Sequence, residues 1–360
     1  SIEINIKEAK DIKKIIDAVN IEIGLTTSEI KIFYKQKLKY SHYNSIILKS
    51  NLTEPEIAKV LAIRYKHDGL DVTASLLREY PYKKISSHVL GRIGYIDKKD
   101  LTRLDKKKYK SSKYIGKTGI EKYYENHLHG TPGYKHVEIN ARGRQLRDID
   151  EKPPIPGKDL YLTIDIELQK YMYSRLLGYT GSSVAINPKN GEILAMVSAP
   201  ALDPNQKLWK LDVDQEQAPI IKSPMFNRAT HGLYSPGSTV KPIMALNGLH
   251  ENIINASQEF YAGPFFQLPN NSRRFRDWKP KGHGIVDLEK SITQSCDVYF
   301  YMLANNLGID KISSFLKYFS FGDKTGLDMP YESSGVLPSN NWKLKNIGTN
   351  WTDGDTVITG

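Results

Sequence analysis

A serine and a lysine three positions apart, Ser238 and Lys241, are the residues of this sequence best suited to covalent chemistry. They follow a Pro-Gly turn signal and precede an apolar run that begins at Ile243, so the sequence predicts a helix that starts near Ser238. Residues at i and i+3 are neighbours on a helix, and Pro242 is tolerated in its first turn. An uncharged Lys241 held against Ser238 can take the serine proton. The pair is therefore predicted to be an activated acyl-transfer nucleophile.

The surroundings of Ser238 distinguish it from two other Ser-x-x-Lys sequences, at Ser28–Lys31 and Ser314–Lys317. A lysine-rich chain produces this short pattern by chance. Only Ser238 has the Pro-Gly entry, the following proline and the apolar segment behind it. At a helix N-terminus the dipole and the free N–H groups also favour developing negative charge, which acyl transfer generates.

A second chemical element, Ser295-Cys-Asp297, is predicted to lie inside a helical stretch, Val286–Leu307. The hydroxyl of Ser295 near the Ser238–Lys241 pair can relay a proton to a leaving amine, and the carboxylate of Asp297 can hold the lysine or bind substrate. The alternative for Ser295 is a serine in a helix interior that bonds to a carbonyl one turn back. The functional interpretation therefore depends on the Ser238 site.

A third group, Asp277, His283 and Cys296, has the residue types that bind zinc, and Cys296 is the only cysteine of the chain. Three ligands leave an open coordination position or make no metal site. A metal here would stiffen the Ser295–Asp297 segment and would take no part in the chemistry. The alternative is a buried free thiol beside a loop histidine. A single cysteine also excludes a disulfide within the chain.

Length and composition bound the fold and the partners. A chain of 360 residues is long enough for two domains, and 39% hydrophobic and 25% charged residues are typical of a folded protein. The net charge of +11 favours an anionic environment such as a phospholipid surface or an acidic polymer. Nucleic acid is not predicted as a partner, because the lysines are dispersed along the sequence and no known nucleic-acid-binding motif accompanies them. No apolar run approaches the roughly 18 residues that span a membrane, and no signal peptide opens the chain.

A proline-rich segment, Lys152–Gly157, is predicted to be a stiff linker. It separates two groups of predicted helices and strands that position the residues described above. Before it, the sequence predicts a helix, a β-rich run and a second helix, at Glu8–Val19, Ile30–Tyr34 and after Thr53. After it, the sequence predicts a strand, a helix and a β-hairpin, at Leu160–Asp165, Ile166–Leu177, and Ser182–Ile186 with Glu192–Ser198. These elements predict an α+β fold with helices packed on a mainly antiparallel sheet, in two domains at residues 1–155 and 156–360.

Several motifs together resemble the class B penicillin-binding proteins, and among them the elongation-type subfamily. In the second domain the motifs are Asn227–Thr230, Ser235–Pro242, Arg276–Trp278, Gly282–Gly284, Ser295–Asp297 and Tyr299–Tyr301. In the first domain, Arg78–Pro81, His88–Gly91 and Gly116–Glu121 resemble that family's pedestal domain. The resemblance covers most of the chain and is specific in combination.

The resemblance implies a monofunctional D,D-transpeptidase that cross-links peptidoglycan stem peptides during lateral wall elongation and cell-shape maintenance, and that β-lactams acylate. Ser238 would be the acylated nucleophile and Lys241 its base, with Ser295 and Asp297 as the second active-site element. No cofactor would be required. The family also implies a single anchor in the bacterial inner membrane, absent here, and a catalytic domain in the periplasm. Its pedestal would bind a scaffold of the MreC type and a lipid-II-polymerising glycosyltransferase of the RodA type.

The sequence departs from the family pattern in its third motif, Lys-(Thr/Ser)-Gly, which is expected on a strand after the Ser-x-Asn element. Lys117-Thr-Gly119 lies in the first domain, and Lys324-Thr-Gly326 lies in a stretch that resembles a turn, so neither is taken as that motif. We therefore expect that a C-terminal piece, with half of the oxyanion hole, is missing from this chain, as are the opening segment of the pedestal and the anchor. The subfamily's zinc pattern has a further aspartate where this sequence has Ala262.

Other functions use the same serine–lysine arrangement. A serine β-lactamase hydrolyses its acyl-enzyme, and the extra first domain argues against this function. A penicillin sensor and a D,D-carboxypeptidase remain open as alternatives. A non-catalytic scaffold that docks partners through its first domain is the alternative of a different class. The presence of Ser238, Lys241 and Ser295 argues against complete inactivity.

Overall fold

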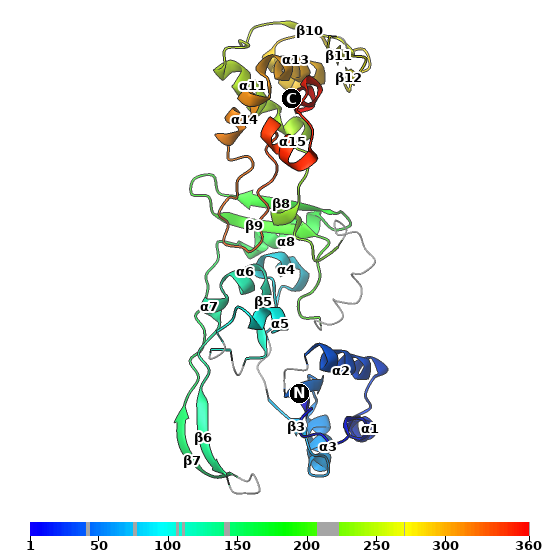
Figure 1. Ribbon diagram of the computed structural model, residues 1–360, viewed down its shortest axis with the longest axis vertical. Coiled ribbons are helices and arrows are strands. Elements are labelled where there is room, and N and C mark those ends of the chain that lie inside the picture. Colours follow the sequence, from blue (N-terminus) through cyan, green and yellow to red (C-terminus); the bar gives the residue numbers. More distant parts are fainter. Residues whose placement is uncertain are drawn as a thin grey trace. The chain divides into compact units, whose positions relative to one another are not determined.

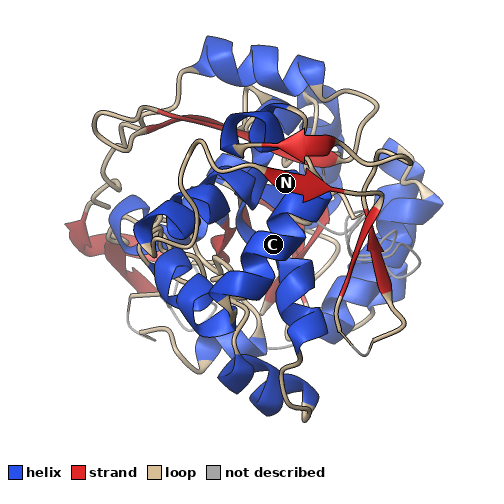
Figure 2. Cartoon of the chain, turned by 90° about the horizontal axis from the view of Figure 1, so that it is seen from above, coloured by secondary structure: helices blue, strands red, loops and turns tan. Residues whose placement is uncertain are grey.

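The computed structural model describes residues 1–40, 44–74, 78–105, 108–109, 112–139, 145–206, 223–269 and 271–359. The chain forms two compact units, Ser1–Ala229 and Thr230–Gly360 (Figure 1). Helices and short antiparallel strands occur in both units, which confirms the α+β class. Figure 2 shows the helices in blue and the strands in red. None of the described helices combines the length and the apolar character needed to cross a membrane.

The first unit begins with a three-stranded antiparallel sheet and three helices. The central strand is β1, and the order is β2-β1-β3, with bounds Ser45–Lys49, Ile2–Asn5 and Leu70–Val72. The helices are α1, α2 and α3, at Ile12–Ile23, Thr27–Lys39 and Glu54–Arg64. Ile2, Ile4 and Val19 are completely buried between sheet and helices, and together with Phe33 and Val60 they form the core of this part.

The β-rich run predicted at Ile30–Tyr34 is wrong, because this stretch lies within helix α2. A capping box starts the helix: the Glu29 N–H donates to Thr26 Oγ1 at 3.2 Å, and Glu29 Oε2 accepts from the Thr26 N–H at 2.9 Å. These bonds satisfy N–H groups that an isolated helix end leaves free, which outweighs the β propensity of the residues that follow. The helix predicted after Thr53 is confirmed and also begins with a capping box.

The next part of the first unit contains two two-stranded antiparallel sheets and several short helices. The sheets pair β4 with β5 and β6 with β7, at Arg92–Tyr95, Tyr114–Thr118, Tyr134–Ile139 and Gln145–Lys152. The short helices are η1, α4, α5, α6 and α7, at Lys83–Ile85, Ser87–Leu90, Lys98–Leu101, Gly119–Tyr123 and Glu125–Leu128. The proline-rich segment that follows β7 is held by paired backbone bonds of 2.8 and 2.9 Å between Thr131 and Ile155.

The predicted helix and hairpin beyond the linker are confirmed as α8, β8 and β9, at Ile166–Arg175, Gly181–Ile186 and Ile193–Ala199. The strand predicted at Leu160–Asp165 is wrong. Among the described residues, two hydrogen bonds link this segment to β9: the Thr163 hydroxyl donates to Ile193 O, and the Asp165 N–H donates to Leu194 O. Pairing stops there because Asp165 turns the chain and caps α8, with its carboxylate accepting from two backbone N–H groups.

A buried amide explains why the first unit continues past the linker as far as Ala229. Gln169 of α8 is 1% exposed. Its Nε2 donates to Ile85 O and Met196 O at 2.9 and 2.8 Å, and its Oε1 accepts from the Met196 N–H at 2.8 Å. Asn205 also exchanges two bonds of 2.8 Å with the backbone of Tyr80. These bonds join α8 and β9 to the segment around η1.

The second unit is built around helix α13 (Figure 1). Helix α13 spans Asp297–Leu307. The other helices of this unit are η3 (Gly237–Val240), α11 (Lys241–His250), α12 (Leu288–Thr293), α14 (Ile309–Lys317), α15 (Asn340–Ile347) and α16 (Asp353–Thr359). A short helix, α10 (Arg228–His231), precedes them. Two small two-stranded antiparallel sheets pair β10 with β13 and β11 with β12, at Phe260–Ala262, Gly284–Val286, Phe265–Gln267 and Arg274–Arg276. Met244, Phe300, Leu303 and Ile312 are buried in the shared core.

Candidate active site

Ser238 and Lys241 lie at the junction of two helical segments, as the sequence predicted. Ser238 belongs to the short 3-10 helix η3, and Lys241 begins α11 directly after it, with Pro242 in the first turn. The Lys241 N–H donates to the carbonyl of Ser238 and so closes this turn. Gly237 enters the turn with φ of +57°, a conformation that costs glycine little. The Ser238 side chain is exposed, whereas Lys241 is only 5% exposed.

Ser295 does not lie inside a helix, and the single helix predicted at Val286–Leu307 is wrong. Helix α12 ends at Thr293 and helix α13 begins at Asp297, with Ser295 between them at φ of +51°. A serine in this left-handed region is strained, and such strain persists only where surrounding contacts fix the backbone. The break turns the Ser295 hydroxyl to Ser238 and lets the Asp297 carboxylate reach Lys241.

A chain of hydrogen bonds connects these residues. The Ser295 hydroxyl donates to Ser238 Oγ at 2.9 Å, and Lys241 Nζ donates to Ser295 Oγ at 3.2 Å. Nζ also donates to the Ser295 carbonyl at 3.0 Å and pairs with Asp297 Oδ1 at 2.5 Å. The structure thus brings together all four residues proposed from the sequence. Among the described residues, no hydrogen bond joins Lys241 Nζ to Ser238 Oγ directly, so the Ser295 hydroxyl connects the two side chains.

The lysine is held in a largely dry environment. Its side chain is 7% exposed and that of Asp297 is 24% exposed. Nζ also lies 5.4 Å from the centre of the Phe300 ring, close enough for a cation–π contact. Ammonium, carboxylate and ring therefore fix the position of Nζ beneath the two hydroxyl groups.

Trp278 supports the second carboxylate oxygen of Asp297, a role that the sequence did not indicate. The backbone N–H of Trp278 donates to Asp297 Oδ2 at 3.2 Å, and the indole Nε1–H donates to Gln294 O at 3.2 Å. Both oxygens of Asp297 are therefore engaged, one by Lys241 and one by the loop that carries Trp278. Only the fold reveals this contact, because 19 positions separate the two residues in the sequence.

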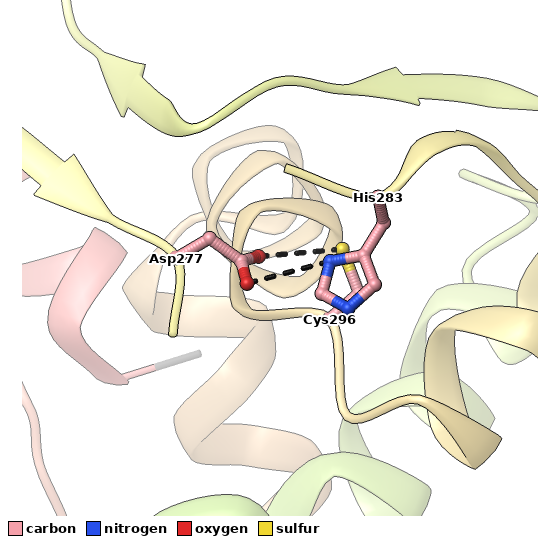
Figure 3. Close-up of side chains that lie close together, drawn as sticks. All are labelled: Asp277, His283 and Cys296. Carbon is pink, nitrogen blue, oxygen red and sulfur yellow. Dashed lines mark hydrogen bonds and ion pairs between the residues drawn. The ribbon is translucent and has the colours of Figure 1, made fainter. Parts of the chain in front are cut away.

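The three candidate zinc ligands, Asp277, His283 and Cys296, lie close together in the second unit (Figure 3). Asp277 Oδ1 lies 3.3 Å from His283 Nδ1, and Oδ2 accepts from Cys296 Sγ at 3.6 Å. Asp277 Oδ2 also accepts from the Val298 N–H at 3.1 Å and so ties the start of α13 to the loop. The candidate ligand atoms all lie within 4.8 Å of one another. The side chains of Asp277 and His283 have no exposed surface. Within the described residues, neither ring nitrogen of His283 makes a hydrogen bond, and its Nδ1 contacts Asp277 only at ion-pair distance.

The charge states of this group follow from burial and hydrogen bonding. Burial raises the pKa of the Cys296 thiol to about 11, and the Asp277 carboxylate acts in the same direction. Burial also favours neutral Asp277, but hydrogen bonds from the Lys279 and Val298 N–H groups and the nearby His283 outweigh it. The pKa of Asp277 therefore lies below its ordinary value. Without a metal, Cys296 is a neutral thiol beside a charged carboxylate at neutral pH.

The two Lys-Thr-Gly sequences make other contacts. Lys117 lies at the end of β5 and forms ion pairs with Asp97 and Asp100. Lys324-Thr-Gly326 lies in a loop, where the Thr325 hydroxyl donates to Glu332 Oε1 at 2.5 Å. Neither sequence lies on a strand that follows Ser295–Asp297.

Comparison with known proteins identifies the class. A family model for the penicillin-binding protein dimerisation domain matches residues 1–162, and a model for the penicillin binding protein transpeptidase domain matches residues 181–359. The chain therefore belongs to the penicillin-binding proteins that join these two domains. Two solved structures of penicillin-binding protein 2 resemble it. The solved structure of Helicobacter pylori PBP2 in complex with MreC superposes with a TM-score of 0.82 at 31% identity, covering 99% of this chain and 68% of that one.

Curated relatives give the same result. The peptidoglycan D,D-transpeptidase MrdA of Acinetobacter baumannii is 39% identical over 355 residues, which cover 97% of this chain and 52% of the relative. The Escherichia coli K12 protein of the same name is 37% identical over 365 residues, which cover 100% and 58%. The chain thus spans about half the length of the curated relatives it matches. Pseudomonas aeruginosa PBP2, solved in complex with WCK 5153, superposes with a TM-score of 0.67 at 39% identity, covering 80% of this chain and 60% of that one.

Proposed function

We propose that this protein is a monofunctional, serine-type peptidoglycan D,D-transpeptidase that works in lateral wall elongation and is acylated by β-lactams. The observation that carries the proposal is the hydrogen-bond chain from Lys241 through Ser295 to Ser238. Residues 1–155 would form the pedestal and residues 156–360 would belong to the transpeptidase domain. The matches at residues 1–162 and 181–359 support this division.

In the first step, Ser238 Oγ attacks the carbonyl carbon of the penultimate D-alanine of a donor stem peptide. An ester forms, the amide bond to the terminal D-alanine breaks, and the serine proton ends on the leaving amine. In the second step, the amine of an acceptor stem peptide attacks the ester. A new amide bond forms, the ester bond breaks, and Ser238 Oγ regains a proton.

Lys241 and Ser295 would carry these protons. A neutral Lys241 can accept the Ser238 proton through the Ser295 hydroxyl, since that hydroxyl contacts both groups. An ammonium has only donors, so the charged lysine orients the chain in the opposite direction, from Nζ through Ser295 to Ser238 Oγ. This is the direction that returns a proton to Ser238 when the ester breaks. Asp297 would hold the lysine through both states.

The test of this function is product analysis with the full-length protein, a donor peptide that ends in D-Ala-D-Ala and an amine acceptor. We expect a cross-linked product, and none in the Ser238→Ala variant. The matched control is Ser314→Ala, which removes the serine of another Ser-x-x-Lys sequence whose hydroxyl only bonds to Asp310 O. Release of D-alanine without cross-linking would indicate a carboxypeptidase, and rapid consumption of penicillin a β-lactamase.

Docking through the first domain is part of the same proposal. The relative from H. pylori was solved in complex with MreC, and we propose that residues 1–155 bind an MreC-type scaffold and a RodA-type glycosyltransferase at the inner membrane. Exposed apolar side chains on the N-terminal helices support this, with Ile21 at 82% and Leu38 at 83%. Co-elution of the full-length protein with the scaffold tests it, and separate elution would contradict it.

We further propose that Asp277, His283 and Cys296 hold a structural zinc ion. The two buried ring nitrogens of His283 support this: in the part of the chain that the structure describes, neither makes a hydrogen bond, and buried polar atoms are otherwise nearly always paired. Ala262 offers no side-chain ligand for a fourth position, and no step of the reaction requires the metal. The ion would fix the loop that carries Trp278 to the start of α13, close to Ser295 and Asp297.

Metal analysis of the purified protein is expected to find about one zinc ion per chain, because the three ligand atoms already lie together. The His283→Asn variant should lose the metal, and His250→Asn, at the end of α11, should keep it. Chelation should lower the Tm of the parent protein and not that of His283→Asn. Protein purified without added chelator and free of zinc would contradict the proposal.

A further inference from the structure

Helix α2 in the first unit presents a basic face to solvent. Lys31, Tyr34, Lys35 and Leu38 stand at i, i+3, i+4 and i+7, so they lie on one side of the helix. All four are exposed, and Leu38 is 83% exposed although it is apolar. The opposite side of α2 is held in the core, where Phe33 is completely buried. These four residues, the lysine face, can therefore meet a partner without any change in the core.

The positive charge of the lysine face is not neutralised by its neighbours. Among the described residues, no ion pair or hydrogen bond engages the side chain of Lys31 or Lys35. The one acidic residue of α2 is Glu29, whose carboxylate is engaged in the capping box. Basic and acidic residues are equal in number in residues 230–360, so the net charge of +11 belongs to residues 1–229. The excess charge thus lies in the unit that carries the lysine face.

We propose that the lysine face docks on the anionic phospholipid surface of the inner membrane, with Lys31 and Lys35 at the lipid phosphates and Leu38 among the headgroups. This inference rests on the proposed function, which places residues 1–155 at that membrane. It assigns Leu38 to the lipid and leaves Ile21 of α1 to the scaffold.

The residue types of the lysine face favour lipid over a protein partner. The negative potential of an anionic bilayer attracts ammonium groups. Tyrosine suits the boundary between headgroups and water, and an exposed leucine gains by leaving water. Lysine is instead depleted in protein–protein interfaces, because its flexible, strongly hydrated side chain is costly to fix and dehydrate.

The test is flotation of the 360-residue chain with lipid vesicles. None of its described helices can span a membrane, so flotation reports binding to the surface. We expect the chain to float with vesicles of mixed phosphatidylglycerol and phosphatidylcholine, and to stay in solution with phosphatidylcholine alone. Added salt should release the bound chain, because it screens exposed charges.

Charge reversal locates the contact. The double variant Lys31→Glu/Lys35→Glu should lower partitioning into the anionic vesicles by about thirtyfold or more, since each lysine at such a surface contributes about fivefold. The matched control is Lys13→Glu/Lys14→Glu, which makes the same change in charge at two exposed lysines of α1. That control should lose less than about threefold, because charges away from the contact are screened.

A second pair of variants tests the apolar contact. Leu38→Ser should lower partitioning by about fivefold, because a partly inserted leucine side chain is lost. The matched control is Ile21→Ser on α1, which removes an apolar side chain of nearly the same exposure, 82%, and should bind as the parent does. Both changes are at the surface, so neither should alter the Tm.

Four results would overturn the inference: no flotation of the parent, equal flotation with both kinds of vesicle, equal losses in the α1 and α2 charge variants, or no loss in Leu38→Ser. An α2 charge variant that still floats but no longer co-elutes with the scaffold would also overturn it, because the lysine face would then bind protein. None of these measurements involves Ser238, so all of these results leave the proposed function intact. A chain that floats as expected, while the full-length protein forms no penicillin adduct, would contradict the proposed function and not the docking.

Discussion

Replacing Lys241 with methionine is expected to lower the rate of acylation by benzylpenicillin by roughly 10²–10⁴-fold, the usual contribution of a positioned general base. Methionine fills a similar volume and cannot take a proton, so the chain through Ser295 to Ser238 loses its acceptor. The rate can be followed by intact-mass analysis of the full-length protein after timed exposure to the drug.

A double variant separates the chemistry of Lys241 from its structural role. Removing the ammonium leaves the half-buried Asp297 carboxylate without its partner, which should cost about 1–3 kcal/mol of stability. Adding Asp297→Asn removes that charge and should restore most of the lost Tm without restoring acylation. Recovery of both together would mean that Lys241 only supports the fold, and an unchanged rate in the single variant would contradict its role as base.

The second large effect is expected in the first unit, at Gly91. Its φ is +76°, and a Cβ built on it would lie 1.9 Å from the carbonyl oxygen of Thr118. An alanine must therefore push β4 away from the end of β5 and also adopt a strained backbone. We expect Gly91→Ala to destabilise this part by about 3 kcal/mol or more. Hydrogen exchange of the β4 and β5 amides reports the change locally, which a single melting curve of a protein with two units does not.

Gly24→Ala is the matched control for Gly91. Gly24 ends α1 at φ of +65°, and a Cβ there would meet nothing within 4 Å. Its replacement should cost about 1 kcal/mol, because only the left-handed conformation is penalised. If the two variants were equally stable, the close backbone approach between Gly91 and Thr118 would not be what fixes the pairing of β4 with β5.

Local signals in the sequence predicted the elements whose ends are set locally. The helix after Thr53, the hairpin of β8 and β9, and the start of α11 near Ser238 all carry capping or turn residues, and the structure confirms them. The run Ile30–Tyr34 was misassigned because residues with high β propensity hid the capping box that begins at Thr26. Propensity is a weak indicator where a cap and a buried face favour the helix.

Contacts between distant segments could not be predicted in this way. The helical spacing of apolar residues continues through Val286–Leu307, yet the helix is interrupted at Ser295. Asp277, on another loop, accepts a hydrogen bond from the Val298 N–H just after this interruption. Residue types, spacing and the family resemblance predicted the residues of the candidate site, but they did not predict the order of these residues in space. The packing of α11, α13 and the β12–β13 connection determines two of these contacts. It places Ser295 between Lys241 and Ser238, and it lets Trp278 hold Asp297.

The most direct test of this account is to locate the acyl group on the full-length protein. After reaction with benzylpenicillin, proteolysis and tandem mass spectrometry should find a single penicilloyl ester, on Ser238. Ser235 of the same peptide should be unmodified, as should Ser295, whose hydroxyl lies 2.9 Å from Ser238 Oγ. An adduct on Ser295 or on any residue other than Ser238, or no adduct at all, would contradict the assignment of Ser238 as the nucleophile.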